Sequence, residues 1–184
     1  MLHSWDAALT GAVNHLAGRT VGLDLLMIWV SRLGVPLLVL VVAAQWWRKR
    51  DRRHWRHILI AAGFSFAAGL ALNQIVLLFL HRARPYDAGV TKLLIARSAD
   101  FSFPSDHATA TAAIAAAFLT HGARKAGLWF LAAALLMAFS RVYVGTHYVG
   151  DVLGGAATGV FAAALVRGLY REGARLDRLL TDFL

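Results

Sequence analysis

The residues from Ser140 to Asp151 could do chemistry, because they place an arginine, a histidine and a carboxylate between two long apolar segments. Ionisable groups at membrane depth are costly and are by default candidates for a functional site. If the chain is helical from Tyr148 onward, His147 and Asp151 stand four residues apart on one helix face. The carboxylate can then accept a proton from one ring nitrogen and leave the other nitrogen as a nucleophile. Arg141 indicates that the substrate is an anion.

Two other stretches add residues of the same chemical kind. Arg84 follows a long apolar segment, and Ser105, Asp106 and His107 open an alanine-rich one. Arginine side chains bind and orient phosphate oxygens, and the N–H groups at a helix start add an anion cradle. We expect His147 to attack phosphorus, while His107 protonates the leaving oxygen and then activates water. Together these residues indicate phosphoryl transfer.

We expect this chemistry to need neither a metal ion nor another cofactor. The acidic residues near these stretches are scattered among cations, which is a poor basis for a two-metal clamp. They are Asp87, Asp100, Asp106 and Asp151. Alone, each site residue also has a structural interpretation: His147 as an interfacial histidine, Arg84 as a topological anchor, Ser105 as a helix N-cap. Their joint spacing favours the functional interpretation.

The elements that position these residues are membrane helices. Hydrophobic residues make up 59% of the chain and charged residues only 16%, which is typical of a polytopic membrane protein. Without cysteine, disulfides and thiolate catalysis are excluded. The apolar segments predict a single all-α domain over residues 1–184, a bundle of about five transmembrane helices. The predicted spans are residues 33–47 with a kinked approach from residue 21, then 58–80, 104–120, 126–139 and 148–166.

Three further segments lie outside the predicted spans. Residues 1–19 suit an interfacial or re-entrant helix, although an ordinary packed helix fits equally well. Residues 86–103 are long enough to form a lid on the outer side, or else a passive cover. Residues 167–184 read as an amphipathic tail on the membrane surface. In the last predicted span, the Gly-x3-Gly spacings at 150/154 and 155/159 predict the close approach of another helix.

The distribution of basic residues predicts the orientation. The net charge of +9 could indicate nucleic acid, but twelve basic residues fall at one set of segment ends, in 48–56, 124–125 and 167–178. Short loops rich in lysine and arginine mark the cytoplasmic side, so we expect no nucleic-acid partner. The C-terminus is then cytoplasmic and the N-terminus outside. Arg84, His107 and His147 all fall on the outer side.

The three stretches together resemble the signature of the type-2 phosphatidic acid phosphatase superfamily. Its pattern is Lys-x6-Arg-Pro, Pro-Ser-Gly-His and Ser-Arg-x5-His-x3-Asp, and the third part matches at every fixed position. Leu77 stands where the lysine is expected, so that phosphate contact is either missing or supplied by Arg82. Asp106 stands where the glycine is expected. Its charge would repel a phosphate unless it pairs with a cation or contacts the headgroup.

The sequence resembles the bacterial undecaprenyl pyrophosphate phosphatase branch in four features. These are the two departures at Leu77 and Asp106, the run from Phe101 to His107, and the short N-terminal region. This resemblance implies removal of the terminal phosphate from undecaprenyl pyrophosphate at the outer face of the bacterial cytoplasmic membrane. That reaction recycles the lipid carrier of cell-wall polymers and can confer bacitracin resistance. By position, it implies the family roles for Arg84, Ser105, His107, Arg141, His147 and Asp151.

Two alternatives stay open at this point. One is the same chemistry on another lipid phosphate: phosphatidylglycerophosphate, phosphatidic acid, diacylglycerol pyrophosphate or lipid A. The other is a small transporter or structural bundle whose outer histidines bind an anion without turnover. The sequence leaves the oligomeric state undetermined.

Overall fold

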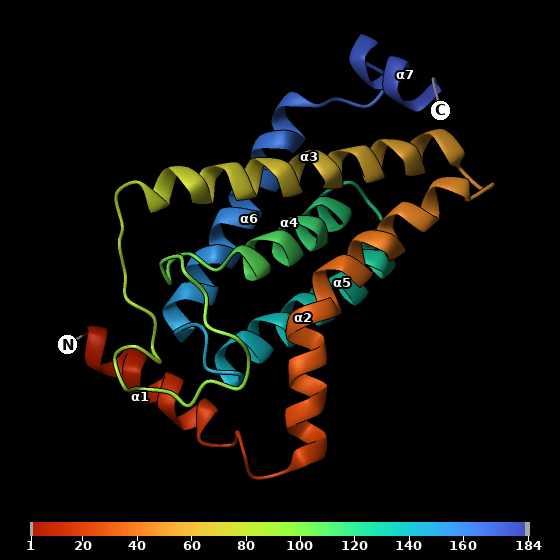
Figure 1. Cartoon of the computed structure of the whole chain (residues 1–184). Coiled ribbons are helices and arrows are strands. Elements are labelled where there is room, and N and C mark those ends of the chain that lie inside the picture. Colours follow the sequence, from red (N-terminus) through yellow and green to blue (C-terminus); the bar gives the residue numbers. More distant parts are fainter. Residues whose placement is uncertain (1, 183–184) are drawn as a thin grey trace.

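A computed structural model describes residues 2–182, and within that range the chain is helical with no strand (Figure 1). This confirms the all-α prediction. In chain order the elements are α1 (Leu2–Asn14), α2 (Val21–Ala44), the short 3-10 helix η1 (Gln45–Trp47), α3 (Arg52–Leu77), α4 (Asp106–Thr120), α5 (Arg124–Tyr143), α6 (Val149–Leu169) and α7 (Arg175–Asp182).

Four segments are long and apolar enough to cross a membrane: α2 together with η1, then α3, α5 and α6. Their outer surfaces carry exposed apolar side chains such as Trp29, Leu135 and Leu153, as expected of helices that face lipid. The predicted third span, α4, has 15 residues, fewer than the roughly 20 that a bilayer requires. The expected set of about five membrane helices therefore corresponds to four long helices and the short α4.

Helix α4 lies inside the bundle and packs against α3, α5 and α6 (Figure 1). Its alanine and threonine side chains are mostly buried. Where α6 meets α4, a Cβ added to Gly159 would lie 2.8 Å from the backbone nitrogen of Ala113. Glycine at this position therefore permits the close approach that its spacing predicts. This packing sets the start of α4 beside the start of α6.

Helix α2 is continuous and contains both the predicted span from residue 33 and its kinked approach from residue 21. It runs through Arg32, Gly34 and Pro36, and it bends partway along its length (Figure 1). A proline inside a helix removes one hydrogen bond and kinks the helix, but in a membrane the backbone stays helical because no water satisfies its polar groups.

Helix α3 begins at Arg52, six residues earlier than the predicted start at residue 58. The basic stretch before the span was read as a loop, but arginine is a good helix former and its long stem can lie along apolar surface. Arg56 is buried here and donates from Nη1 to the carbonyl of Thr181 at 2.7 Å. The first turns of α3 therefore serve as a platform for the C-terminal segment.

Helix α1 turns its polar side toward the protein. Thr10 and Asn14 are buried, whereas Trp5 and Leu9 are exposed. This is the arrangement of a helix whose apolar face meets lipid and whose polar face meets the protein. The N-terminal helix is thus present, and its position at the membrane interface stays a prediction.

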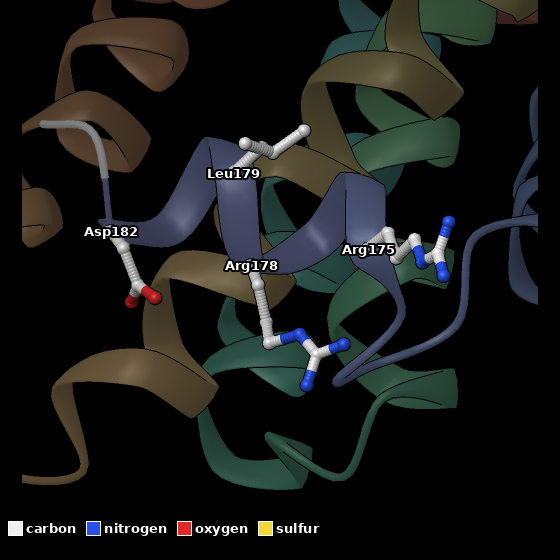
Figure 2. Close-up of a pocket in the computed structure, with 4 residues that line it drawn as sticks. All are labelled: Arg175, Arg178, Leu179 and Asp182. Atoms are coloured by element: carbon white, nitrogen blue, oxygen red, sulfur yellow. The ribbon is translucent and has the colours of Figure 1, made fainter.

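Helix α7 packs at the end of the bundle opposite Arg84. It is held to the start of α3 by a buried hydrogen bond of 2.8 Å between His57 Nδ1 and the Asp177 carboxylate. On its outer side, Arg175, Arg178, Leu179 and Asp182 surround a hollow of about 450 Å³ (Figure 2). The hollow lies near the start of α3 and Arg84 follows the end of α3, so the hollow does not belong to the predicted site.

Candidate active site

The candidate nucleophile, His147, lies buried in the turn between α5 and α6. Its Nδ1 is 2.8 Å from the carbonyl oxygen of Ser102. A carbonyl only accepts hydrogen bonds, so Nδ1 carries the ring proton and Nε2 carries the lone pair. Nε2 in turn faces Arg84, whose Nη1 lies 3.4 Å away. The nitrogen that carries the lone pair is therefore directed at a guanidinium, a group suited to bind phosphate.

Arg84 lies in the loop after α3 and only 4% of it is exposed. Its Nε and Nη2 donate to the backbone oxygen and carboxylate of Asp100, at 3.0 and 2.8 Å. Its Nη1 also donates to the carbonyl of Thr146 at 3.0 Å. These bonds tie the guanidinium to two separate loops, so its position is set before any ligand binds.

Arg141, in the last turn of α5, is the second buried guanidinium. Its Nη1 donates to Ser31 Oγ on α2 at 2.6 Å, and its Nε has no hydrogen-bond partner among residues 2–182. The charges of Arg84 and Arg141 act on each other. Arg84 is paired with Asp100, whereas Arg141 forms no ion pair with any of the described residues. A buried charge without a partner is unfavourable unless an anion neutralises it, so the site is suited to an anion.

The start of α4 adds the third part of the site. Ser105 is the N-cap, and its backbone nitrogen donates to the carbonyl of Asp151 at 3.1 Å. Its hydroxyl is buried and has no partner within the described part of the chain. His107, the second residue of the helix, interacts electrostatically with Arg141, His147 and Arg84. All three signature stretches therefore meet at one end of the bundle.

The position of Asp151 corrects one prediction. Its carboxylate lies 3.6 Å from His147 Nδ1, beyond hydrogen-bond distance, and the Ser102 carbonyl takes the ring proton instead. The helical i, i+4 geometry does not apply, because α6 begins at Val149 and His147 precedes it. Asp151 instead caps α6 by accepting from the backbone nitrogen of Tyr148 at 2.8 Å, and it accepts from the Ser102 hydroxyl. It supplies a nearby negative charge and holds Ser102 in place.

Arg82 and Asp106 also differ from the predicted phosphate contacts. Arg82 is bound to Asp6 and Asp151, at 2.6 and 2.7 Å, and lies over the ring of Tyr148. Asp106 accepts from the amide of Asn73 at 2.6 Å rather than pairing with a cation. Both side chains are thus engaged by protein partners, and their contact with phosphate stays a prediction.

Sequence reasoning missed Ser31, Asp100 and Ser102. Ser102 lies within the run that carried the family resemblance, whereas Ser31 is a lone hydroxyl in an apolar helix. Ser102 acts mainly through its carbonyl, which any residue type provides, so no side-chain pattern could reveal it. Asn73 on α3 bonds to α4, where its amide donates to Asp106 and, at 2.9 Å, to Thr109 Oγ1.

The side chains present define what the site can do. Within residues 2–182, no three histidine, aspartate or glutamate side chains form a group that could hold a metal ion. Two guanidiniums, a helix start with a free hydroxyl and an imidazole lone pair are gathered instead. This set can bind a phosphate group and attack it.

Burial lowers the pKa of His147 from its ordinary value of 6.5 to about 4. Burial disfavours the charged ring and the two arginines repel a further cation, so the ring is neutral at neutral pH and Nε2 keeps its lone pair. In the ligand-free protein in detergent, we expect the ¹⁵N shifts of this histidine to titrate near pH 4. The His147→Gln variant identifies the signal. A midpoint near pH 6.5 would show that the ring is solvated and not held as described.

Comparisons with known proteins found a matching family and similar sequences and structures. Residues 58–173 match the model of the PAP2 superfamily. The chain is similar to undecaprenyl-diphosphatase BcrC of Bacillus subtilis (strain 168), with 35% identity over 78% of this chain and 72% of the relative. It is also similar to phosphatidylglycerophosphatase B of the same organism, with 30% identity over 91% and 84% of the two chains. Among solved structures, it resembles the transmembrane PAP2 type phosphatidylglycerolphosphate phosphatase from B. subtilis, with a TM-score of 0.70, 26% identity and coverage of 95% and 88%.

Proposed function

We propose a substrate for this chain, which belongs to the PAP2 superfamily and is a membrane lipid phosphatase. It hydrolyses undecaprenyl pyrophosphate to undecaprenyl phosphate and inorganic phosphate. The observation that carries the chemistry is the lone pair of His147 Nε2, which faces Arg84 at 3.4 Å in a buried basic site. The substrate assignment rests on the similarity to an undecaprenyl-diphosphatase.

In the first step, Arg84 and Arg141 bind the oxygens of the terminal phosphate, and their mutual repulsion is relieved. Nε2 of His147 attacks the terminal phosphorus, and the bond from phosphorus to the bridging oxygen breaks. The negative charge of the bound substrate offsets Arg141 and Arg84, whose charges disfavour a protonated ring on His107. His107 then takes up a proton from solvent and donates it to that oxygen, which leaves as undecaprenyl phosphate. The product on the enzyme is a phosphohistidine, whose positive ring is stabilised by the nearby charge of Asp151.

In the second step, water attacks the phosphohistidine. His107, now neutral, takes a proton from the water, whose oxygen forms a bond to phosphorus while the bond from phosphorus to Nε2 breaks. Inorganic phosphate leaves and both histidines return to their starting states. No step requires a metal ion, because the arginines and the start of α4 neutralise the charge on phosphate.

An apolar groove of about 260 Å³ between α2 and α5 supports a lipid substrate. Trp29 and Val30 line it directly before Ser31, the partner of Arg141, and Met137 lines it one turn before Arg141. The groove thus adjoins the phosphate-binding end and is formed by membrane helices. We infer that the hydrocarbon chain of the substrate lies there.

The proposed location is the bacterial cytoplasmic membrane, with the site on its outer side. The basic segments at the opposite end, near α7 and the start of α3, then face the cytoplasm. This orientation is the one that the resemblance to undecaprenyl pyrophosphate phosphatases implies for recycling of the carrier.

Phosphatidylglycerophosphate is the second candidate substrate. A relative 30% identical over 91% of this chain and a structural neighbour both carry that activity in their names. Both substrates present a terminal phosphate on a lipid and would use the same residues. The two differ in the leaving group, a phosphate for one and an alcohol for the other.

We expect the purified protein to show a higher kcat/KM for undecaprenyl pyrophosphate than for phosphatidylglycerophosphate, phosphatidic acid, diacylglycerol pyrophosphate or lipid A. The measurement is release of inorganic phosphate in detergent with EDTA present throughout. A preference for a phospholipid monophosphate would overturn the substrate. Activity that appears only when Mg²⁺ is added would overturn the metal-free mechanism, and release from none of these lipids would favour an anion-binding protein without turnover.

A further inference from the structure

The polar face of α1 is directed at the start of α6. Asp6, Thr10 and Asn14 are spaced four residues apart and so lie on one side of the helix. Asp6 Oδ1 accepts from the backbone nitrogen of Gly150 at 2.8 Å, and Thr10 Oγ1 accepts from that of Val149 at 3.0 Å. These N–H groups are among those a helix leaves without internal partners, so α1 completes the cap of α6.

Asp6 also begins a chain of ion pairs that ends at the candidate site. Its Oδ2 is 2.6 Å from Arg82 Nη2, and Arg82 Nη1 is 2.7 Å from Asp151 Oδ1. The Asp151 side chain is fully buried, while the Arg82 and Asp6 side chains are 24% and 16% exposed. Arg82 is also held by the ring of Tyr148, 3.8 Å from the guanidinium carbon. The series of ion pairs from Asp6 through Arg82 to Asp151 is therefore ordered and largely shielded from solvent.

The charges of these three side chains explain why the Asp6 carboxylate is needed in addition to that of Asp151. Arg82 alone would neutralise Asp151, and a neutral pair could do little to stabilise a positive ring on His147. With Asp6 on the other side of the guanidinium, the three groups carry one net negative charge. Arg82 also divides its hydrogen bonds, with Nη2 bound to Asp6 and only Nη1 bound to Asp151. The negative charge behind His147 thus depends on a residue in the first helix.

We propose that Asp6 is a positioning residue of the reaction: through Arg82 it fixes the Asp151 carboxylate and preserves the negative charge that stabilises phosphorylated His147. This inference rests on the proposed phosphohistidine chemistry but not on the identity of the lipid. It assigns to α1 a role in the reaction.

The test compares Asp6→Asn, Asp6→Glu, Arg82→Gln and the Asp6→Asn/Arg82→Gln double variant in the full-length protein. By analogy with residues that orient metal ligands, we expect Asp6→Asn to lower kcat about tenfold to a hundredfold with little change in KM. Asp6→Glu keeps the charge and is expected to recover most of kcat. In the double variant, Asp6→Asn is expected to add little to Arg82→Gln, because Asp6 acts through Arg82.

Two controls separate this role from general destabilisation. Asp182→Asn removes a carboxylate bound to an arginine at 2.8 Å, at the far end of the bundle, and is expected to leave kcat unchanged. Unfolding temperatures identify any variant that fails to fold. The inference is overturned if Asp6→Asn keeps kcat within about twofold, if Asp6→Glu is no better than Asp6→Asn, or if the effects of Asp6→Asn and Arg82→Gln add fully.

A readout without turnover separates this inference from the proposed function. If the wild type releases no phosphate, the proposed function fails. The ¹⁵N titration of His147 still reports the net charge of Asp6, Arg82 and Asp151. Arg84, Arg141, His107 and Asp151 also act on this ring and are unchanged in the Asp6→Asn variant. Loss of a negative charge is expected to lower the pKa of His147 further, and an unchanged titration contradicts the inference.

Discussion

Replacing His147 with asparagine is expected to lower kcat by at least about three powers of ten. Among the residues described, His147 offers the buried lone pair that faces Arg84, and asparagine fills similar space without a nucleophilic nitrogen. Loss of a catalytic nucleophile in hydrolases with comparable covalent intermediates typically costs several powers of ten. Phosphate release from undecaprenyl pyrophosphate over a range of substrate concentrations measures the effect.

The matched control is His54→Asn. His54 also lies near a carboxylate, with Nδ1 2.9 Å from Glu172, but it is exposed and lies at the other end of α3. We expect it to keep wild-type kcat. If His147→Asn retains more than about a tenth of wild-type kcat, another group attacks phosphorus and the assignment of the nucleophile is wrong.

Arg84→Lys is expected to lower kcat/KM by about a hundredfold to a thousandfold, the usual result of removing one donor to a developing negative charge. Lysine keeps the charge, but it cannot donate to Asp100, Thr146 and a phosphate oxygen from fixed planar positions as arginine does. The phosphate is then no longer held in one position, and the loops that contain Asp100 and Thr146 are no longer tied together. Steady-state kinetics and the unfolding temperature separate these contributions.

Arg97→Lys is the matched control. It tests whether the expected loss of kcat/KM comes from the position of Arg84 or from any exchange of arginine for lysine in this loop. Arg97 pairs with Asp87 at 3.1 Å on the exposed part of the same loop, and exposed pairs contribute little to stability. We expect wild-type kinetics from this variant. Comparable losses in both variants, or a less than fivefold loss for Arg84→Lys, would contradict the role given to Arg84.

The general fold and the convergence of the site were predictable from the sequence. Long apolar runs must form helices in a membrane, and successive helices cross in opposite directions. The end of α3, the start of α4 and the turn before α6 therefore had to meet at one end of the bundle. Arg84, Ser105, His107 and His147 follow from that topology.

The supporting contacts were not predictable, for physical reasons that differ from residue to residue. The group that fixes the ring proton of His147 is the backbone carbonyl of Ser102, which carries no signal in residue type. Arg82 was read as a phosphate contact because its charge suits a phosphate, and only the three-dimensional position of Asp6 shows its other partners.

The central claim is that an imidazole held between a loop carbonyl and a buried arginine takes the phosphate onto its own nitrogen. Rapid quenching of the wild-type reaction at alkaline pH, followed by peptide mass spectrometry, tests this claim most directly. The expected result is phosphate on Nε2 of His147 within the first turnover, and none in His147→Asn. Phosphate on another residue, or wild-type turnover during which no phosphorylated protein forms, would contradict it.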